Sequence, residues 1–193
     1  MKATYLFTFL FFFSFLEKNT AQTSIISSGV YVTIEDFKNN RLIEEADCKN
    51  NKEKIERHDF FSKQEFVVIN KGKKLTYQKK DIYAYRDCEN KTWRFCDNKE
   101  YQILETKVIY IYSLRKIVLN GATIEKDAVY YFSNGPSGEI KELSISNLKV
   151  VYPNNQVFHN MLDAEFNSDK AIQSYDVENK MYKVNYLLIQ SKK

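Results

Sequence analysis

The strongest constraint on this chain of 193 residues is a succession of short segments rich in β-branched and aromatic residues, separated by polar turns. Runs of this composition are typical of strands joined by hairpins. Because no helix-like segment separates most of them, we expect a mostly antiparallel, hairpin-rich sheet. The segments are residues 65–69, 75–77, 82–86, 92–96, 101–105, 108–112, 129–132 and 139–143.

The turns between these segments carry the residues that hairpins require. Residues 70–73, Asn-Lys-Gly-Lys, separate the first two segments and predict a tight turn. Residues 133–138 contain two glycines and one proline, which predict a sharp reversal before the last strand.

Helical signals lie on either side of this strand-rich region. Residues 29–33 predict a short strand, after which Thr33 is a candidate N-cap with Asp36 three residues later. The short helix is expected to run through Phe37 and to end at residues 39–40, Asn-Asn.

The C-terminal quarter of the chain changes to helical spacing of apolar residues. Residues 155–166 follow a Pro-Asn breaker, and the tail from Ile172 to Leu188 shows steps of three, four or six. We therefore expect two C-terminal helices. Strands first and helices last predict an α+β fold rather than alternating α/β.

The N-terminus carries the pattern of a cleavable signal peptide. A mostly apolar block, residues 5–16, follows the single charge of Lys2 and stops at Glu17, so it is too short to span a bilayer. Ala21 provides a small residue before a cut that would leave Gln22 first. We expect residues 1–21 to be removed, with no stable membrane span afterwards and a periplasmic or extracellular product.

Residues 22–193 have the length of a single domain. The net charge of the whole chain is only +4, which indicates no particular partner. Within the domain, residues 44–58 are densely charged and nearly without apolar residues, so we predict a mobile, exposed loop there.

Three cysteines, Cys48, Cys88 and Cys96, lie in the expected mature chain. An oxidising compartment permits one disulfide and leaves one thiol, and the spacing leaves the pairing open. A tight turn at residues 89–91 would place Cys88 opposite Thr92 and Cys96 opposite Ala84, so these two cysteines would not face each other. The spacing does not match a structural zinc site.

Four motifs stand out along the chain: Gly29-x-Tyr31-x-Thr33-x-Glu35-Asp36-Phe37-x-Asn39-Asn40, Asp81-Ile82-Tyr83-Ala84-Tyr85-Arg86-Asp87, Tyr130-Tyr131-Phe132 and Gly138-Glu139-Ile140-x-Glu142-Leu143. Together they resemble a group of uncharacterised exported proteins of Bacteroidetes. The resemblance covers most of residues 29–166 and implies an exported single domain, with no activity or catalytic residue attached. Cys88 departs from the pattern, because a turn residue such as glycine is expected there.

Candidate catalytic groups are scarce. The only histidines are His58, in the charged segment, and His159, four residues before Asp163 on an expected helix, and two ligands do not make a metal site. Ser137 lies in a Gly-Pro-Ser-Gly turn without the spacing of a nucleophile elbow. None of the cysteines has a local histidine signature. We therefore predict no catalytic residue, metal or cofactor.

Basic and aromatic residues alternate along the strands at 82–86 and 92–96. Such a face stacks sugars or other planar groups, while export argues against a nucleic-acid partner. We predict an exported, non-enzymatic domain that binds a protein, a glycan or another surface ligand. Two alternatives are a secreted hydrolase with an unrecognised site and an envelope component that assembles with itself. The expected binding face consists of Tyr83, Tyr85, Arg86, Trp93 and Arg94.

Overall fold

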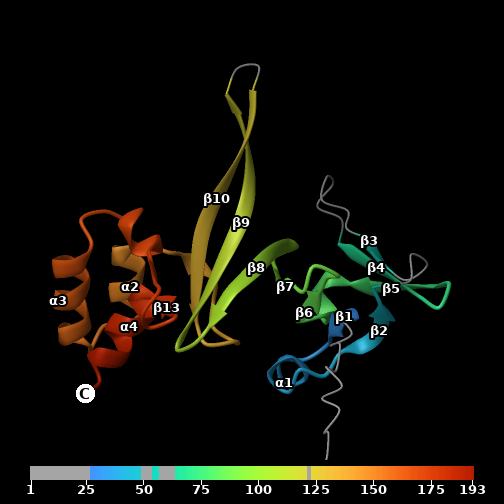
Figure 1. The fold of residues 1–193 in the computed structure, drawn as a ribbon, viewed down its shortest axis with the longest axis horizontal. Coiled ribbons are helices and arrows are strands. Elements are labelled where there is room, and N and C mark those ends of the chain that lie inside the picture. Colours follow the sequence, from blue (N-terminus) through green and yellow to red (C-terminus); the bar gives the residue numbers. More distant parts are fainter. Residues whose placement is uncertain (1–26, 49–53, 57–63, 121–122) are drawn as a thin grey trace, which may run out of the picture.

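The computed structural model describes residues 27–48, 54–56, 64–120 and 123–193 (Figure 1). The predicted signal peptide, residues 1–21, lies outside the described residues. The elements are β1 (Ser27–Tyr31), α1 (Ile34–Lys38), β2 (Ile43–Asp47), β3 (Lys54–Glu56), β4 (Glu65–Asn70), β5 (Lys73–Gln78), the 3-10 turn η1 (Lys79–Asp81), β6 (Ala84–Arg86), β7 (Thr92–Cys96), β8 (Lys99–Thr106), β9 (Ile109–Asn120), β10 (Thr123–Asn134), β11 (Lys141–Glu142), α2 (Ile145–Val151), α3 (Gln156–Glu165), η2 (Ala171–Gln173), β12 (Tyr175–Asp176), β13 (Met181–Tyr182) and α4 (Lys183–Gln190).

The strands form one large antiparallel sheet and two small ones. The large sheet has eight strands in the order β11-β10-β9-β8-β7-β6-β1-β2, and β3-β4-β5 and β12-β13 form the small sheets. From β6 to β11 each strand pairs with the next one along the chain. The predicted α+β fold with a mostly antiparallel, hairpin-rich sheet is confirmed.

Two local predictions near the N-terminus are confirmed in detail. Helix α1 begins after Thr33, whose hydroxyl accepts a hydrogen bond from the Asp36 backbone N–H at 3.0 Å, while the Asp36 carboxylate accepts one from the Thr33 N–H at 2.9 Å. This is a complete capping box with Asp in the place where Glu or Gln is commoner. The β4–β5 turn has positive φ at Lys71 (49°) and Gly72 (75°), as a type I′ hairpin turn requires.

The C-terminal region contains three helices rather than the predicted two. The additional helix is α2, a short helix that the sequence pattern did not predict. Ser144 caps it by accepting a hydrogen bond from the Asn147 N–H at 3.1 Å. The predicted tail helix is wrong before Lys183, because residues 171–182 form η2 and the β12–β13 hairpin. Asp176 accepts hydrogen bonds from Asn179, and Lys180 has φ of 51°, so a turn interrupts the helical spacing.

The prediction of an exposed loop over residues 44–58 is wrong for residues 44–47 and 54–56, which form most of β2 and all of β3. Residues 49–53 and 57–58 lie outside the described residues. Both are edge strands, β2 in the large sheet and β3 in the three-stranded sheet. Charged residues are common on edge strands, where they discourage pairing with other chains. The lack of apolar residues was therefore no evidence against strands here.

The longest strands are β9 and β10, twelve residues each. They pair continuously from Ile109↔Asn134 to Asn120↔Thr123 and so extend well beyond the predicted segments 108–112 and 129–132. The intervening residues mix charged with β-branched types, which hid the strands in the sequence. Figure 1 shows this hairpin projecting away from the rest of the molecule.

Buried apolar residues form separate clusters at the two ends of the large sheet. The C-terminal core packs α2, α3 and α4 on one face of β9 and β10, and includes Ile109, Phe132, Leu148, Phe158 and Leu188. The N-terminal core lies among β1, β4, β6 and β7 and consists of Val30, Phe66, Val68, Ile82, Tyr85, Trp93 and Phe95. A third cluster of Tyr101, Tyr110 and Tyr112 packs with Phe37 of α1.

Candidate ligand-binding cleft

A cleft of about 620 Å³ opens beside the N-terminal core. Three parts of the chain meet at it: the start of β4 and end of β5, the η1 turn, and the β7–β8 turn. Its size lies within the range of small-ligand sites. Most of its lining is polar, formed by Gln64, Gln78, Lys79, Lys80, Ile82, Phe95, Cys96, Asp97 and Asn98.

A buried ion pair holds one wall of the cleft. The Lys79 side chain is only 5% exposed, and its Nζ lies 2.8 Å from Oε1 of Glu100. The other carboxylate oxygen of Glu100 accepts a hydrogen bond from the Tyr85 hydroxyl at 2.9 Å. The Lys79 Nζ also lies 5.5 Å from the centre of the Phe95 ring. Removing one partner would leave a buried charge without its counterion, so this wall is expected to be rigid.

A second part of the lining is the tight turn between β7 and β8. Cys96 pairs with Lys99 across the turn, and Asp97 and Asn98 both have positive φ, 49° and 60°. These angles identify a type I′ turn, and Asp and Asn tolerate them better than other side chains do. The three-stranded sheet reaches the cleft through a hydrogen bond of 2.7 Å from the Lys79 N–H to the Gln64 carbonyl.

Cys96 is the one cysteine outside a disulfide in the part of the chain that is described. Burial raises the pKa of its thiol, and the neighbouring Asp97 carboxylate raises it further, against a smaller opposing effect of Arg94. The thiol lies 3.8 Å from Oδ2 of Asp97 and contributes to the cleft lining. A raised pKa keeps it protonated at neutral pH, which disfavours a nucleophilic role.

The predicted binding face does not form a single exposed surface. Tyr85 is fully buried and Trp93 is 3% exposed, and both belong to the N-terminal core. Arg94 is 8% exposed and points to the other side of the sheet, between the Tyr83 and Tyr112 rings. Alternation along β6 and β7 therefore places Tyr85 and Trp93 on one face and Arg86 and Arg94 on the other. Tyr83 precedes β6, and its ring lies against Arg94.

Arg94 organises a polar network rather than an open site. It donates hydrogen bonds to the Tyr112 hydroxyl at 2.8 Å and to the Gly138 carbonyl at 3.1 Å, and the Tyr83 hydroxyl donates to the Pro136 carbonyl. Its Nε has no hydrogen-bond partner, and Arg94 forms no ion pair within the described residues. The network fixes the turn after β10 against the sheet.

Arg86, the fifth predicted residue, lies near α1. Its guanidinium donates hydrogen bonds to the Tyr31 hydroxyl and to the Asn40 side-chain carbonyl, and it stacks 5.6 Å from the Tyr31 ring centre. These contacts hold the end of α1 against β1 and β6. Arg86 therefore has a structural role and is not part of the cleft lining.

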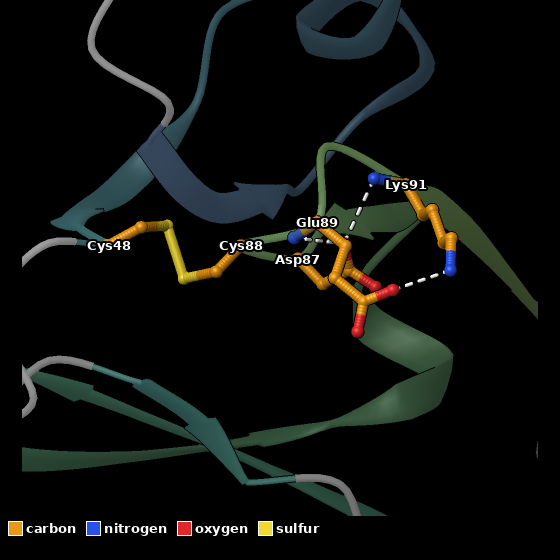
Figure 2. The surroundings of a disulfide bond; sticks show 5 residues. All are labelled: Cys48, Asp87, Cys88, Glu89 and Lys91. Atoms are coloured by element: carbon orange, nitrogen blue, oxygen red, sulfur yellow. Dashed lines mark hydrogen bonds and ion pairs between the residues drawn. A yellow bond between two sulfur atoms is a disulfide. The ribbon is translucent and has the colours of Figure 1, made fainter.

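The disulfide joins Cys48, at the end of β2, to Cys88, in the loop between β6 and β7 (Figure 2). Asp87 shapes that loop, because its carboxylate accepts hydrogen bonds from the N–H groups of Glu89 and Lys91 at 2.9 Å and from the Trp93 indole at 2.8 Å.

This wider loop corrects the predicted register. Arg86 lies opposite Thr92, two residues from the expected pairing of Cys88 with that residue. A shift of two preserves which face each side chain occupies. The prediction that Cys88 and Cys96 do not face each other is confirmed.

The other candidate catalytic groups have structural roles. His159 contacts the Tyr152 carbonyl at 2.9 Å, and Asp163 pairs with Lys149 at 2.6 Å, so the two do not act together. Ser137 lies in the turn between β10 and β11, as expected. His58 falls outside the described residues. No group of three or more metal-ligating side chains occurs among the residues that the structure describes.

The lysine pair at the cleft, Lys79 and Lys80, lies just before the predicted strand at residues 82–86, and its composition alone did not indicate a cleft. Nothing in the sequence linked Lys79 to Glu100, or Gln64 to Asn98, because these residues meet through sheet pairing. None of the helices in the described part of the chain combines the length and apolar character needed to cross a bilayer. Comparison with protein-family models, curated proteins and solved structures finds no match to this chain.

Proposed function

We propose that this protein is an exported binding domain without catalytic activity, and that its ligand occupies the polar cleft. The observation that carries the proposal is a cleft of about 620 Å³ with one wall built on a buried ion pair, which is expected to hold that wall in place. Preorganised walls favour binding because little side-chain freedom is lost when a ligand enters.

The lining favours a glycan segment as the ligand. Side-chain amides of Gln64, Gln78 and Asn98 each offer donors and an acceptor, and Lys80 and Asp97 add one charge of each sign. Sugar hydroxyls also act as both donor and acceptor, so a neutral oligosaccharide matches such a surface. A strongly charged ligand would be repelled by whichever of these two residues carries a charge of the same sign.

The same residues argue against a hydrolase that depends on a cysteine nucleophile or a histidine base. A hydrolase needs a nucleophile or a base within hydrogen-bond reach of the substrate. The Cys96 thiol is held protonated by its raised pKa, and His159 lies on α3, at the far end of the molecule from β5 (Figure 1).

The Cys48–Cys88 disulfide supports export, since such bonds persist in oxidising compartments. Expression of the full chain in a bacterial host, followed by fractionation and N-terminal sequencing, tests this part. We expect a periplasmic or secreted product that begins at Gln22. A cytoplasmic product that retains residues 1–21 would refute export.

Binding is tested with three neutral probes, chitotetraose, cellotetraose and maltotetraose, by NMR titration of the exported protein. We expect at least one probe to cause saturable shifts at cleft residues. Gln78→Ala should reduce affinity several-fold, because it removes one amide from the lining. Gln156→Ala, on the exposed surface of α3, is the matched control and should bind as the wild type does.

Failure of all three probes to shift the cleft resonances would contradict the glycan assignment. A peptide or protein that shifts those same resonances would redirect the proposal to a protein ligand. Hydrolysis of any probe, detected by an assay for new reducing ends, would overturn the proposal that the domain has no catalytic activity.

A further inference from the structure

Strand β5 forms an open edge of the small sheet β3-β4-β5. It pairs with β4, and no other described strand pairs with it. Lys74 and Thr76 of β5 are exposed, while Leu75 and Tyr77 are half-buried. In Figure 1, this sheet lies at the end of the molecule away from the C-terminal helices. The outer edge of β5 is therefore accessible to a partner strand.

The register of the β4–β5 hairpin shows which backbone groups of β5 face this edge. Lys73 directly follows the two-residue turn, so its N–H and C=O groups bond to β4. Every second residue of an antiparallel ladder repeats this orientation, and the hydrogen bond of 2.7 Å from the Lys79 N–H to the Gln64 carbonyl continues the same alternation. The N–H and C=O groups of Lys74 and Thr76 consequently point away from β4, where an added strand would find them.

The charged side chains at the turn end of this edge are all basic. Lys71, Lys73 and Lys74 are exposed, and none of them forms an ion pair within the described residues. Lysines on an edge discourage pairing with neutral or basic strands, whereas an acidic strand would supply the missing counterions. A second copy of β5 does not fit, because it would bring two more lysines and no acidic residue. The charges therefore favour an acidic partner.

We propose that β5 binds an extended acidic segment of another protein, which adds to the small sheet as a fourth strand. Peptides that add to a sheet edge gain affinity from main-chain hydrogen bonds and specificity from their side chains. Antiparallel addition matches the existing sheet and places the acidic residues at the C-terminal end of the segment, beside Lys73 and Lys74. The proposal does not depend on what the cleft binds, because neither Lys74 nor Thr76 lines the cleft.

The first test titrates an acetylated and amidated peptide, Thr-Val-Thr-Val-Glu-Glu, into the isotope-labelled protein and follows it by NMR. We expect saturable shifts of the Lys74 and Thr76 amide resonances, together with slower hydrogen exchange at both amides. The same peptide with lysines in place of the two glutamates should bind several-fold more weakly. Absence of shifts at both amides, or equal affinity for the two peptides, would overturn the proposal.

The second test removes a backbone donor from the edge. Thr76→Pro deletes an N–H that points away from β4, at the kind of edge position where proline is tolerated. It should abolish binding of the acidic peptide, and unchanged Trp93 fluorescence verifies that the variant is folded. Thr76→Val keeps the N–H and is the matched control, so it should bind as the wild type does. Undiminished binding to the folded proline variant would refute strand addition.

The third test removes the charges and leaves the backbone intact. Lys73→Gln with Lys74→Gln should weaken binding of the acidic peptide several-fold and abolish its preference over the lysine peptide. Lys170→Gln with Lys192→Gln removes the same net charge from exposed positions in the C-terminal region and should bind as the wild type does. Equal weakening by both double variants would show a general charge effect and refute the assignment to β5. Concentration-dependent shifts of the Thr76 amide without peptide would identify a second copy as the partner instead and overturn the acidic assignment.

Discussion

The two ends of the large sheet are stabilised in different ways. At the C-terminal end, three helices cover one face of β9 and β10 and bury an extended, largely aliphatic core. At the N-terminal end, the core is smaller and more aromatic, and it is accompanied by a disulfide and a buried ion pair. The difference indicates that covalent and polar links compensate where little apolar surface is available.

Two spectroscopic signals of the protein report separately on the unfolding of the two ends. Its single tryptophan, Trp93, lies in the N-terminal core, so indole fluorescence reports on that end. The three longest helices, α2, α3 and α4, all pack at the C-terminal end, so far-UV circular dichroism at helical wavelengths reports mainly on them. Coincident transitions by both probes would mean that the chain unfolds as one unit.

The largest effect is expected from truncating the C-terminal core. Phe158 is fully buried, and Phe158→Ala should lower the free energy of unfolding by about 3–5 kcal/mol. Urea unfolding followed by circular dichroism measures the loss. Val157→Ala, at a neighbouring residue that is 54% exposed, should change it by no more than about 0.5 kcal/mol. Equal effects of the two variants would contradict the core assignment.

Loss of the disulfide should act mainly on the N-terminal end. The bond closes a loop with a sequence separation of 40 residues, for which the chain-entropy relation gives about 4 kcal/mol. Cys48→Ser with Cys88→Ser should therefore move the Trp93 transition to lower urea concentration. The helical signal should move less if the two ends unfold separately.

Cys96→Ser is the control for this prediction, because Cys96 forms no disulfide. It should leave both transitions nearly unchanged. If the double variant instead shifts the two transitions by the same amount, the two ends unfold as one unit. They would then differ in the composition of their cores but not in stability.

A smaller effect is expected at the contact between α4 and the sheet. Asn185 is fully buried, accepts a hydrogen bond from the Ile109 N–H at 2.7 Å and donates one to the Ile109 carbonyl at 2.8 Å. Asn185→Ala leaves both backbone groups without a partner and should cost about 1–3 kcal/mol. Circular dichroism in urea measures the change. Gln190→Ala, near the end of the same helix, should have little effect.

The predictability of the fold from the sequence differed in a similar way between regions. Local signals were sufficient where they were strong, as at the Thr33 cap, the Lys71-Gly72 turn and the aromatic strands. They failed for β2 and β3, because edge strands need no apolar pattern, and for residues 171–182, where a turn built on Asp176 overrides helical spacing.

The candidate site was less predictable than the fold. Tyr85 and Trp93 were assigned to a binding surface, but aromatic residues on a half-buried strand have the same composition whether they face solvent or a core. The three-stranded sheet covers one face of β6 and β7, and the sequence contained no indication of that contact. Lys79 and Glu100 likewise become neighbours only through sheet pairing.

The smallest predicted effect concerns the pH dependence contributed by α1. Hydrogen bonds from the Thr33 hydroxyl, and then from Arg41 and the Thr33 N–H, hold the pKa of the Asp36 carboxyl below its ordinary value. A carboxyl group with a lower pKa in the folded state contributes stability that is present above the unfolded pKa of about 3.9. That contribution is lost as the pH falls through the folded pKa.

Asp36→Asn should therefore destabilise the protein relative to wild type at neutral pH, and the difference should shrink once the pH falls below about 4. Thermal unfolding at several pH values measures this convergence. Glu35→Gln changes a neighbouring exposed carboxylate and should show no comparable convergence. The ion pair of Glu35 with Lys38 lies at the surface, where such pairs contribute little stability. If the Asp36 difference were constant with pH, the capping box would act through its shape alone, and the charge of the carboxylate would contribute nothing to the N-terminal end.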